Sequence, residues 1–156
     1  MRLAEEKKIV PLINSANTGV GVSLDSINMS KFHRATIIIT FGAVVGDAVL
    51  TVNSGAADGA LTSPLTFHHS RGGAAIGSAN ADVIEADATT ASLTLTAATY
   101  TTRMLILEVD ASAMDVANGE EWLTVAISAA GTSAIVHAVA ILEPRYTGNL
   151  SATALA

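Results

Sequence analysis

Hydrophobic and polar positions alternate with a period of two along most of the chain. Val20, Val22 and Leu24 alternate with small or polar residues, which is typical of a strand with one buried face. The runs 35–41 (ATIIITF) and 103–110 (RMLILEVD) are almost continuously aliphatic or β-branched, which favours strands inside a sheet. Six further strands are predicted at residues 47–53, 65–70, 82–87, 91–96, 121–128 and 134–143.

Turn signals separate these strands at intervals of roughly ten residues. Asp58-Gly59 favours a positive φ, and residues 71–81, rich in glycine, alanine and serine, predict an exposed loop. The last two strands are expected to pair with each other across a loop at Gly131, and Pro144 to end the second of them. The pattern predicts an all-β fold, an antiparallel β-sandwich or jelly-roll-like barrel of about eight strands.

The two ends of the chain differ from this pattern. We expect an N-terminal arm at residues 1–17, a β-sandwich domain at 18–146 and a loose C-terminal tail at 147–156. In the arm, residues 2–8 predict one or two helical turns that end before Pro11. Its apolar edge consists of Leu3, Ile9, Val10, Leu12 and Ile13. Because so short a helix is marginal alone in water, the arm must pack on its own domain or on a neighbouring subunit.

The longest charge-free stretch, residues 122–142, has the length of a membrane span. Its interior contains Ser128, Gly131 and His137, which favour two strands and a turn. The first ten residues lack the continuous apolar region of a secretory signal, since two glutamates interrupt them. We therefore expect a soluble chain that is neither secreted nor membrane-bound.

Composition narrows the classes of partner. Eight basic and 14 acidic residues give a net charge of −6, which disfavours nucleic-acid binding. The absence of cysteine excludes disulfides, thiolate zinc sites and cysteine nucleophiles. Charged residues make up 14% of the chain and hydrophobic residues 50%, whereas a typical soluble domain is about 25% charged. So little charge predicts that part of the outer surface is buried in a symmetric homo-oligomer.

No catalytic motif is present. The chain has no phosphate-binding loop, no G-x-S-x-G elbow and no H-E-x-x-H pair. His68 and His69 would point to opposite faces of a strand, so they cannot share a metal, although one histidine on a threefold axis would supply three ligands. Asp82, Glu85 and Asp87 do not share one strand face either. We predict a non-enzyme with no catalytic, cofactor-binding or metal-binding residues and no cofactor.

Aromatic residues are few, at 4% of the chain. Phe41 and Trp122 lie in strongly apolar strands and are expected in the core. Tyr100 and Tyr146 are the candidates for exposed rings, and an exposed ring is what a carbohydrate-binding module needs.

Several segments resemble small structural proteins encoded in the head modules of tailed bacteriophages. They are residues 26–33 (SINMSKFH), 35–42 (ATIIITFG), 103–110 (RMLILEVD), 122–127 (WLTVAI) and 140–146 (AILEPRY). The resemblance implies a β-sandwich that trimerises on the outside of the capsid as a decoration, or cement, protein. It implies no catalytic residues. In such proteins an N-terminal arm often reaches along the shell, which makes Leu3, Ile9, Val10, Leu12 and Ile13 the expected partner-binding residues.

The expected partners follow from the same resemblance. They are the chain itself, as a homo-oligomer with a trimer favoured, and the major capsid protein, with no nucleic acid and no membrane. The expected location is the capsid surface of the virion, after assembly in the host cytoplasm. The alternatives are a tail, neck or head-fibre component of the virion, and a carbohydrate-binding module.

Overall fold

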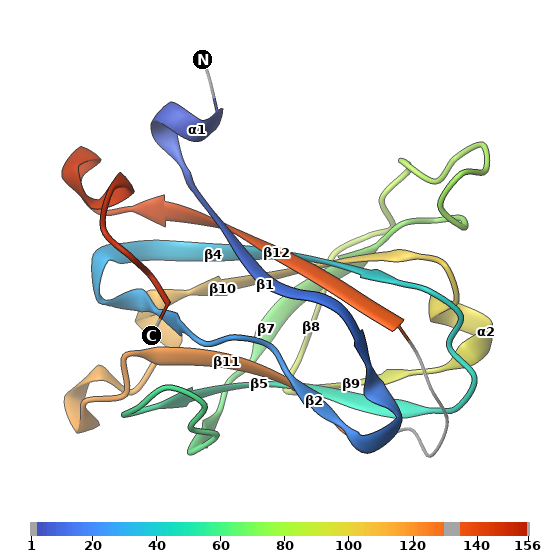
Figure 1. Ribbon diagram of the computed structural model, residues 1–156, viewed down its shortest axis with the longest axis horizontal. Coiled ribbons are helices and arrows are strands. Elements are labelled where there is room, and N and C mark those ends of the chain that lie inside the picture. The colour runs from blue at the N-terminus through green and yellow to red at the C-terminus, as the bar shows by residue number, and fades with distance from the viewer. Residues whose placement is uncertain (1–2, 130–134, 156) are drawn as a thin grey trace.

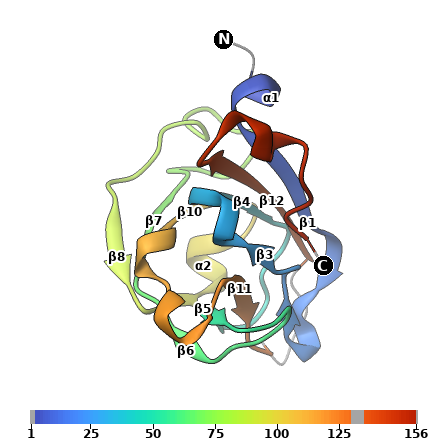
Figure 2. The ribbon, with the colours of Figure 1, turned by 90° about the vertical axis from the view of Figure 1, so that its left-hand side faces the viewer.

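The computed structural model describes residues 3–129 and 135–155, which fold into a sandwich of two antiparallel sheets (Figure 1). Sheet A has the strand order β1 (Lys8–Asn17), β12 (Ile135–Pro144), β4 (Phe32–Phe41), β10 (Met104–Asp110), β7 (Phe67–Arg71) and β8 (Ala88–Thr90). Figure 2, turned by 90°, shows β1 and β8 at opposite edges of this sheet.

Sheet B is built around β11 (Trp122–Ile127) and β5 (Ala48–Gly55). The outer edge of β11 pairs with two short strands, β2 (Val22–Ser23) and β3 (Ile27–Asn28). The outer edge of β5 pairs with β6 (Ser63–Pro64) and β9 (Ser92–Leu95). Eight of the twelve described strands have at least four residues. The prediction of an all-β sandwich is therefore confirmed.

Helical segments are short and lie between the strands. The α-helices are α1 (Leu3–Glu6) and α2 (Ala97–Tyr100). The 3-10 turns are η1 (Thr18–Val20), η2 (Met29–Lys31), η3 (Ala111–Ala113), η4 (Val116–Asn118) and η5 (Thr147–Leu150). Gly59 and Gly119 both have positive φ, as the turns that contain them require.

One hydrophobic core fills the space between the sheets. Alternate residues of β4 point into it, and Phe32, Ile37 and Ile39 have no exposed surface. Leu50 and Leu123 join the same core from sheet B. Because successive side chains of a strand point to opposite faces, the residues between these core positions face outward.

The predicted pairing of the last two strands is wrong. β11 pairs with β2, β3 and β5 in sheet B, whereas β12 pairs with β1 and β4 in sheet A. The chain therefore crosses from one sheet to the other between residues 127 and 135. The loop at Gly131, across which pairing was expected, lies outside the described residues. The alternation of residues in a strand indicates its buried face but not the strand with which it pairs. A hairpin and a crossover therefore give the same sequence pattern.

The predicted strand at residues 82–87 is also wrong. Among these residues only Ile84 forms an isolated bridge, with Gly72, and the regular strand β8 begins at Ala88. A hydrogen bond from Val83 N to Asn80 O instead holds a turn, and Asp82 and its successors are exposed. A strand with both faces in water has no apolar side to bury, so this acidic segment remains irregular.

The predicted N-terminal arm is part of the sandwich. Residues 8–17 form the edge strand β1, which pairs along β12 with two register shifts, one of them beside Pro11. Val10 and Leu12 are buried in the core. Lys7 N donates to Leu3 O and ends the short α1, before Pro11 is reached.

The C-terminal segment is attached as well. η5 begins at Thr147, and further along Asn28 N donates to Ala154 O at 2.8 Å. Ala154 is buried and Leu155 packs against the core. Small and polar composition suggested a loose tail. Two further hydrogen bonds, from Asn149 Nδ2 to Lys31 O and from Lys8 Nζ to Leu150 O, also hold this segment on the domain.

Candidate interaction surface

The outer face of sheet A carries a row of apolar side chains that crosses four strands. Pro11 of β1 lies opposite Val139 of β12, Val139 opposite Ile38 of β4, and Ile38 opposite Ile106 of β10. These residues alternate with core residues, so their side chains point away from the interior. All of them retain part of their accessible surface. The sandwich thus has a second apolar layer that its own core does not use.

Two ion pairs lie near this face, and Glu108 of β10 is exposed two residues from Ile106. Arg34 Nε lies 2.9 Å from Asp110 Oδ1, and Lys7 Nζ lies 2.8 Å from Glu143 Oε1. The hydrogen bond and charge of Lys7 lower the pKa of Glu143, and those of Asp110 raise the pKa of Arg34. Both pairs lie toward one end of the strands. The central row is left without a charged group and suits an apolar partner surface.

A groove opens where this face meets the edge strand β1. Its volume is about 360 Å³. Its apolar lining includes Pro11, Ile13, Ile38 and Val139, and its polar lining includes Asn14, Thr40 and His137. Ser15 N donates to Nδ1 of His137 at 3.2 Å. Asn14 Oδ1 lies 3.2 Å from the same nitrogen, so the imidazole of His137 is held among polar atoms of β1 at the polar end of the groove.

The loop between β7 and β8, residues 72–87, projects beyond sheet A on the same side as α1 (Figures 1 and 2). The outer face of the sheet therefore lies between two projections. Three aliphatic side chains of this loop are exposed: Ile76 at 53%, Val83 at 55% and Ile84 at 41%.

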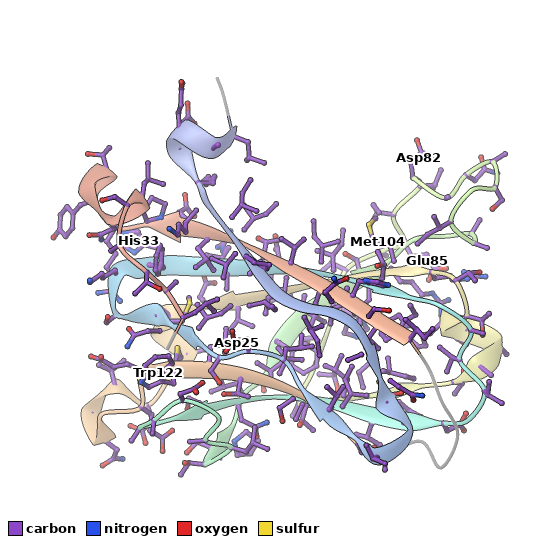
Figure 3. The ribbon with its side chains drawn as sticks, in the orientation of Figure 1. Asp25, His33, Asp82, Glu85, Met104 and Trp122 are labelled. Atoms are coloured by element: carbon purple, nitrogen blue, oxygen red, sulfur yellow. The ribbon has the colours of Figure 1, made fainter. Side chains whose placement is uncertain are left out.

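A charged cluster fixes the base of this loop. Arg103 Nη1 donates to the carbonyl oxygens of Gly72 and Gly73, at 3.3 and 2.9 Å. Arg71 Nε lies 2.7 Å from Glu85 Oε2, and the Arg71 guanidinium stacks over the ring of Tyr100 at 5.8 Å. Figure 3 shows Glu85 near the base of the loop and Asp82 at its top. The loop is therefore held at both of its ends.

The residues predicted to bind a partner divide into two sets. Leu3 and Ile9 are exposed at 43% and 46%, and Ile13 is half-buried on the groove. Val10 and Leu12 are 3% and 5% exposed and belong to the core, so they are corrected to structural residues.

Sequence reasoning missed the outer row and the projecting loop. Ile38 lies in a run that was interpreted as a strand covered on both faces, and Ile106 and Val139 lie in runs for which no outer face was predicted. The signal that would have found them is the alternation of Ala and larger aliphatics in β12, which separates an inner from an outer face. No such signal marks Ile76 or Val83, because an irregular loop has no period.

The candidate chemical groups are scattered. His68 and His69 face opposite sides of β7, as predicted: His68 Nδ1 lies 2.7 Å from Asp87 Oδ2, and the His69 ring tilts against Phe67. Within residues 3–129 and 135–155, no group of three or more histidine, aspartate or glutamate side chains is arranged to hold a metal ion.

The aromatic predictions are met in part. Phe41 is buried as expected, and Tyr146 is 76% exposed. Trp122 is only partly buried. Tyr100 is 4% exposed, with its ring edge against Phe41, so it offers no platform for a sugar. A short helix, α2, places Tyr100 inward over the core.

Comparisons with known proteins add no assignment. No protein-family model matches the chain, and searches of curated proteins and of solved structures find no significant match. None of the helices in the described part of the chain has the length and apolar character of a membrane span.

Proposed function

We propose that this chain is a virion structural protein of a tailed bacteriophage, a capsid decoration protein that self-associates on the outer capsid surface. A trimer is the favoured assembly, and its task is to hold neighbouring major capsid subunits together. The observation that carries the proposal is the uncharged apolar row Pro11–Val139–Ile38–Ile106 on the outer face of sheet A. The resemblance of the strand segments to phage head proteins supports the choice of class.

The size of this face suits a protein partner. The six strands of sheet A contain 45 residues, and at about 3.3 Å per residue and about 4.8 Å between strands they give a face on the order of 700 Å². A stable protein interface buries about 800 Å² on each partner. A small ligand would leave most of such a face uncovered.

The lack of charge in the row favours contact with another copy of the chain. Two copies carry the same net charge of −6, so an unpaired acidic patch would repel its own copy. The internal pairs Arg34–Asp110 and Lys7–Glu143 neutralise two acidic groups near the row, and Glu108 is the exposed carboxylate that remains beside it. In the proposal the shell contact uses the part of the N-terminal segment that is exposed, namely Leu3 and Ile9.

Two measurements test the proposal. Light scattering at two protein concentrations should give the mass of a trimer, and the protein should sediment with expanded phage heads from which it has been omitted. The matched variants are Ile38→Ser in the row and Thr89→Ser on the exposed strand β8. The first should lower the trimer fraction and head binding together, and the second should change neither. A protein that is monomeric at both concentrations and stays in the supernatant would refute the proposal.

A further inference from the structure

The projecting loop and the groove both carry aliphatic side chains, but they lie toward opposite edges of sheet A. The loop, residues 72–87, leaves from β7 and returns to β8 at one edge, whereas the groove lies over β1, β12 and β4 and none of its lining residues belongs to the loop. β7 and β1 are four strand spacings apart, about 19 Å. The loop of one molecule therefore does not cover its own groove.

The loop is preorganised as an apolar projection. Gly73 N donates to Val83 O at 2.7 Å, and Ile76 N donates to Thr102 O at 2.7 Å. With the bonds from Arg103, these contacts tie the loop both across itself and to the body of the sandwich. An ordered loop loses less conformational entropy on binding than a disordered one, so its exposed aliphatic side chains are suited to docking.

We propose that the loop of one copy inserts Val83 and its aliphatic neighbours into the groove of the next copy. This inference rests on the self-association in the proposed function and specifies the two surfaces that meet. A contact between two different surfaces is heterologous, and it closes into a ring when the rotation between copies closes. A rotation of one third of a turn gives the favoured trimer.

Size and charge support this pairing. The groove volume of about 360 Å³ is roughly twelve times the ~30 Å³ that one water occupies, which is room for two or three aliphatic side chains. The lining of the groove combines aliphatic side chains with the polar side chains of Asn14 and His137, and the Asn14 amide nitrogen is a donor. Asp82 stands at the top of the loop beside Val83 and supplies an acceptor for such donors.

Cross-linking tests the pairing directly, because the chain contains no cysteine. Val83→Cys places a thiol on the loop and Val139→Cys places one in the groove. With a short bismaleimide, a mixture of the two variants should give cross-linked dimers, whereas each variant alone should give none. A chain with both substitutions should give dimers and trimers and nothing larger. The control is a mixture of Thr89→Cys, on β8, with Val139→Cys. This mixture should give no cross-linked dimers.

Two outcomes overturn the inference. Cross-linked dimers of Val139→Cys alone would show that two outer faces of sheet A pack on each other. An absence of cross-links in the mixture, from protein that is trimeric by light scattering and binds heads, would place the contact elsewhere and leave the proposed function standing. A monomer that does not bind heads would refute both.

Complementation gives a second, independent readout. Val83→Asp blocks the loop and Val139→Asp blocks the groove, so each variant alone should be monomeric by light scattering. Mixed in equal amounts, they retain one intact loop and one intact groove per pair and should form dimers. Circular dichroism checks that both variants fold. A mixture that stays monomeric, from variants that are folded, contradicts the head-to-tail contact.

Discussion

The hydroxyl of Ser54 donates a hydrogen bond of 2.6 Å to Oε2 of Glu120, and both residues are buried. The other carboxylate oxygen, Oε1, accepts a bond of 3.1 Å from Ser63 Oγ. These residues come from β5, β6 and the segment before β11. The Glu120 carboxylate therefore joins three separate parts of sheet B at one end of the sandwich.

Replacing Glu120 by leucine should destabilise the fold by about 1–3 kcal/mol, because the buried Ser54 hydroxyl would lose its acceptor. Glu120→Gln retains a carbonyl oxygen and should cost less. Denaturant unfolding of both variants measures the difference. A leucine variant as stable as the parent, or a glutamine variant that is the less stable of the two, would contradict this role of the carboxylate.

Leu12 and Ile9 test whether β1 belongs to the core. Both lie on the same strand, but Leu12 is 5% exposed and Ile9 is 46% exposed. Leu12→Ala should lower the free energy of unfolding by about 2–5 kcal/mol through loss of burial and a cavity. Ile9→Ala should change it by less than about 0.5 kcal/mol. Denaturant midpoints measure both, and equal effects would indicate an arm that is not packed on the sandwich.

The long strands follow from the sequence. β4 and β10 are recognised by nearly continuous runs of aliphatic and β-branched residues, and β12 by an apolar run that ends at Pro144. Pairing partners do not follow, since β11 and β12 look like a hairpin in sequence but enter different sheets. Short strands such as β2 and β3 could not be predicted either, because two residues are too few to show a period. These strands form only through pairing with β11.

Arg103 should determine how firmly the projecting loop is held. Its bonds to the carbonyls of Gly72 and Gly73 lie at the base of the loop. Arg103→Ala should speed amide hydrogen exchange in residues 74–84 and leave exchange in β4 and β12 unchanged, because local opening does not require global unfolding. Arg103→Lys keeps the charge but loses the planar guanidinium group. Its exchange rates in the loop should lie between those of the parent protein and those of Arg103→Ala. Unchanged exchange in the loop of Arg103→Ala would show that other contacts hold it.

The candidate surface was much harder to predict than the fold. The low content of charged residues indicated that part of the outer surface is covered, but it did not indicate which part. Val10 and Leu12 were assigned to a partner because they were placed on a short amphipathic arm, and because the resemblance implies an arm that reaches along the shell. In the structure Pro11 lies on an edge strand, where its missing N–H is tolerated. The groove joins residues 11–14, 38–40 and 137–139, and only the register of three strands brings them together.

Tyr100 should lose its phenolic proton only above the pH at which an exposed tyrosine does. Burial raises the pKa of its hydroxyl, the nearby Arg71 lowers it, and Glu85 raises it again. A pKa raised in the folded state stabilises the fold fully below about pH 10, the unfolded value, and this stabilisation is lost as the pH rises through the folded value.

The chain has two tyrosines, so Tyr146→Phe isolates the signal of Tyr100. Absorbance at the phenolate band should then give a midpoint above that of free tyrosine, with unfolding followed by circular dichroism in the same titration. A midpoint at or below that of free tyrosine, in protein that is still folded, would contradict the burial of this ring.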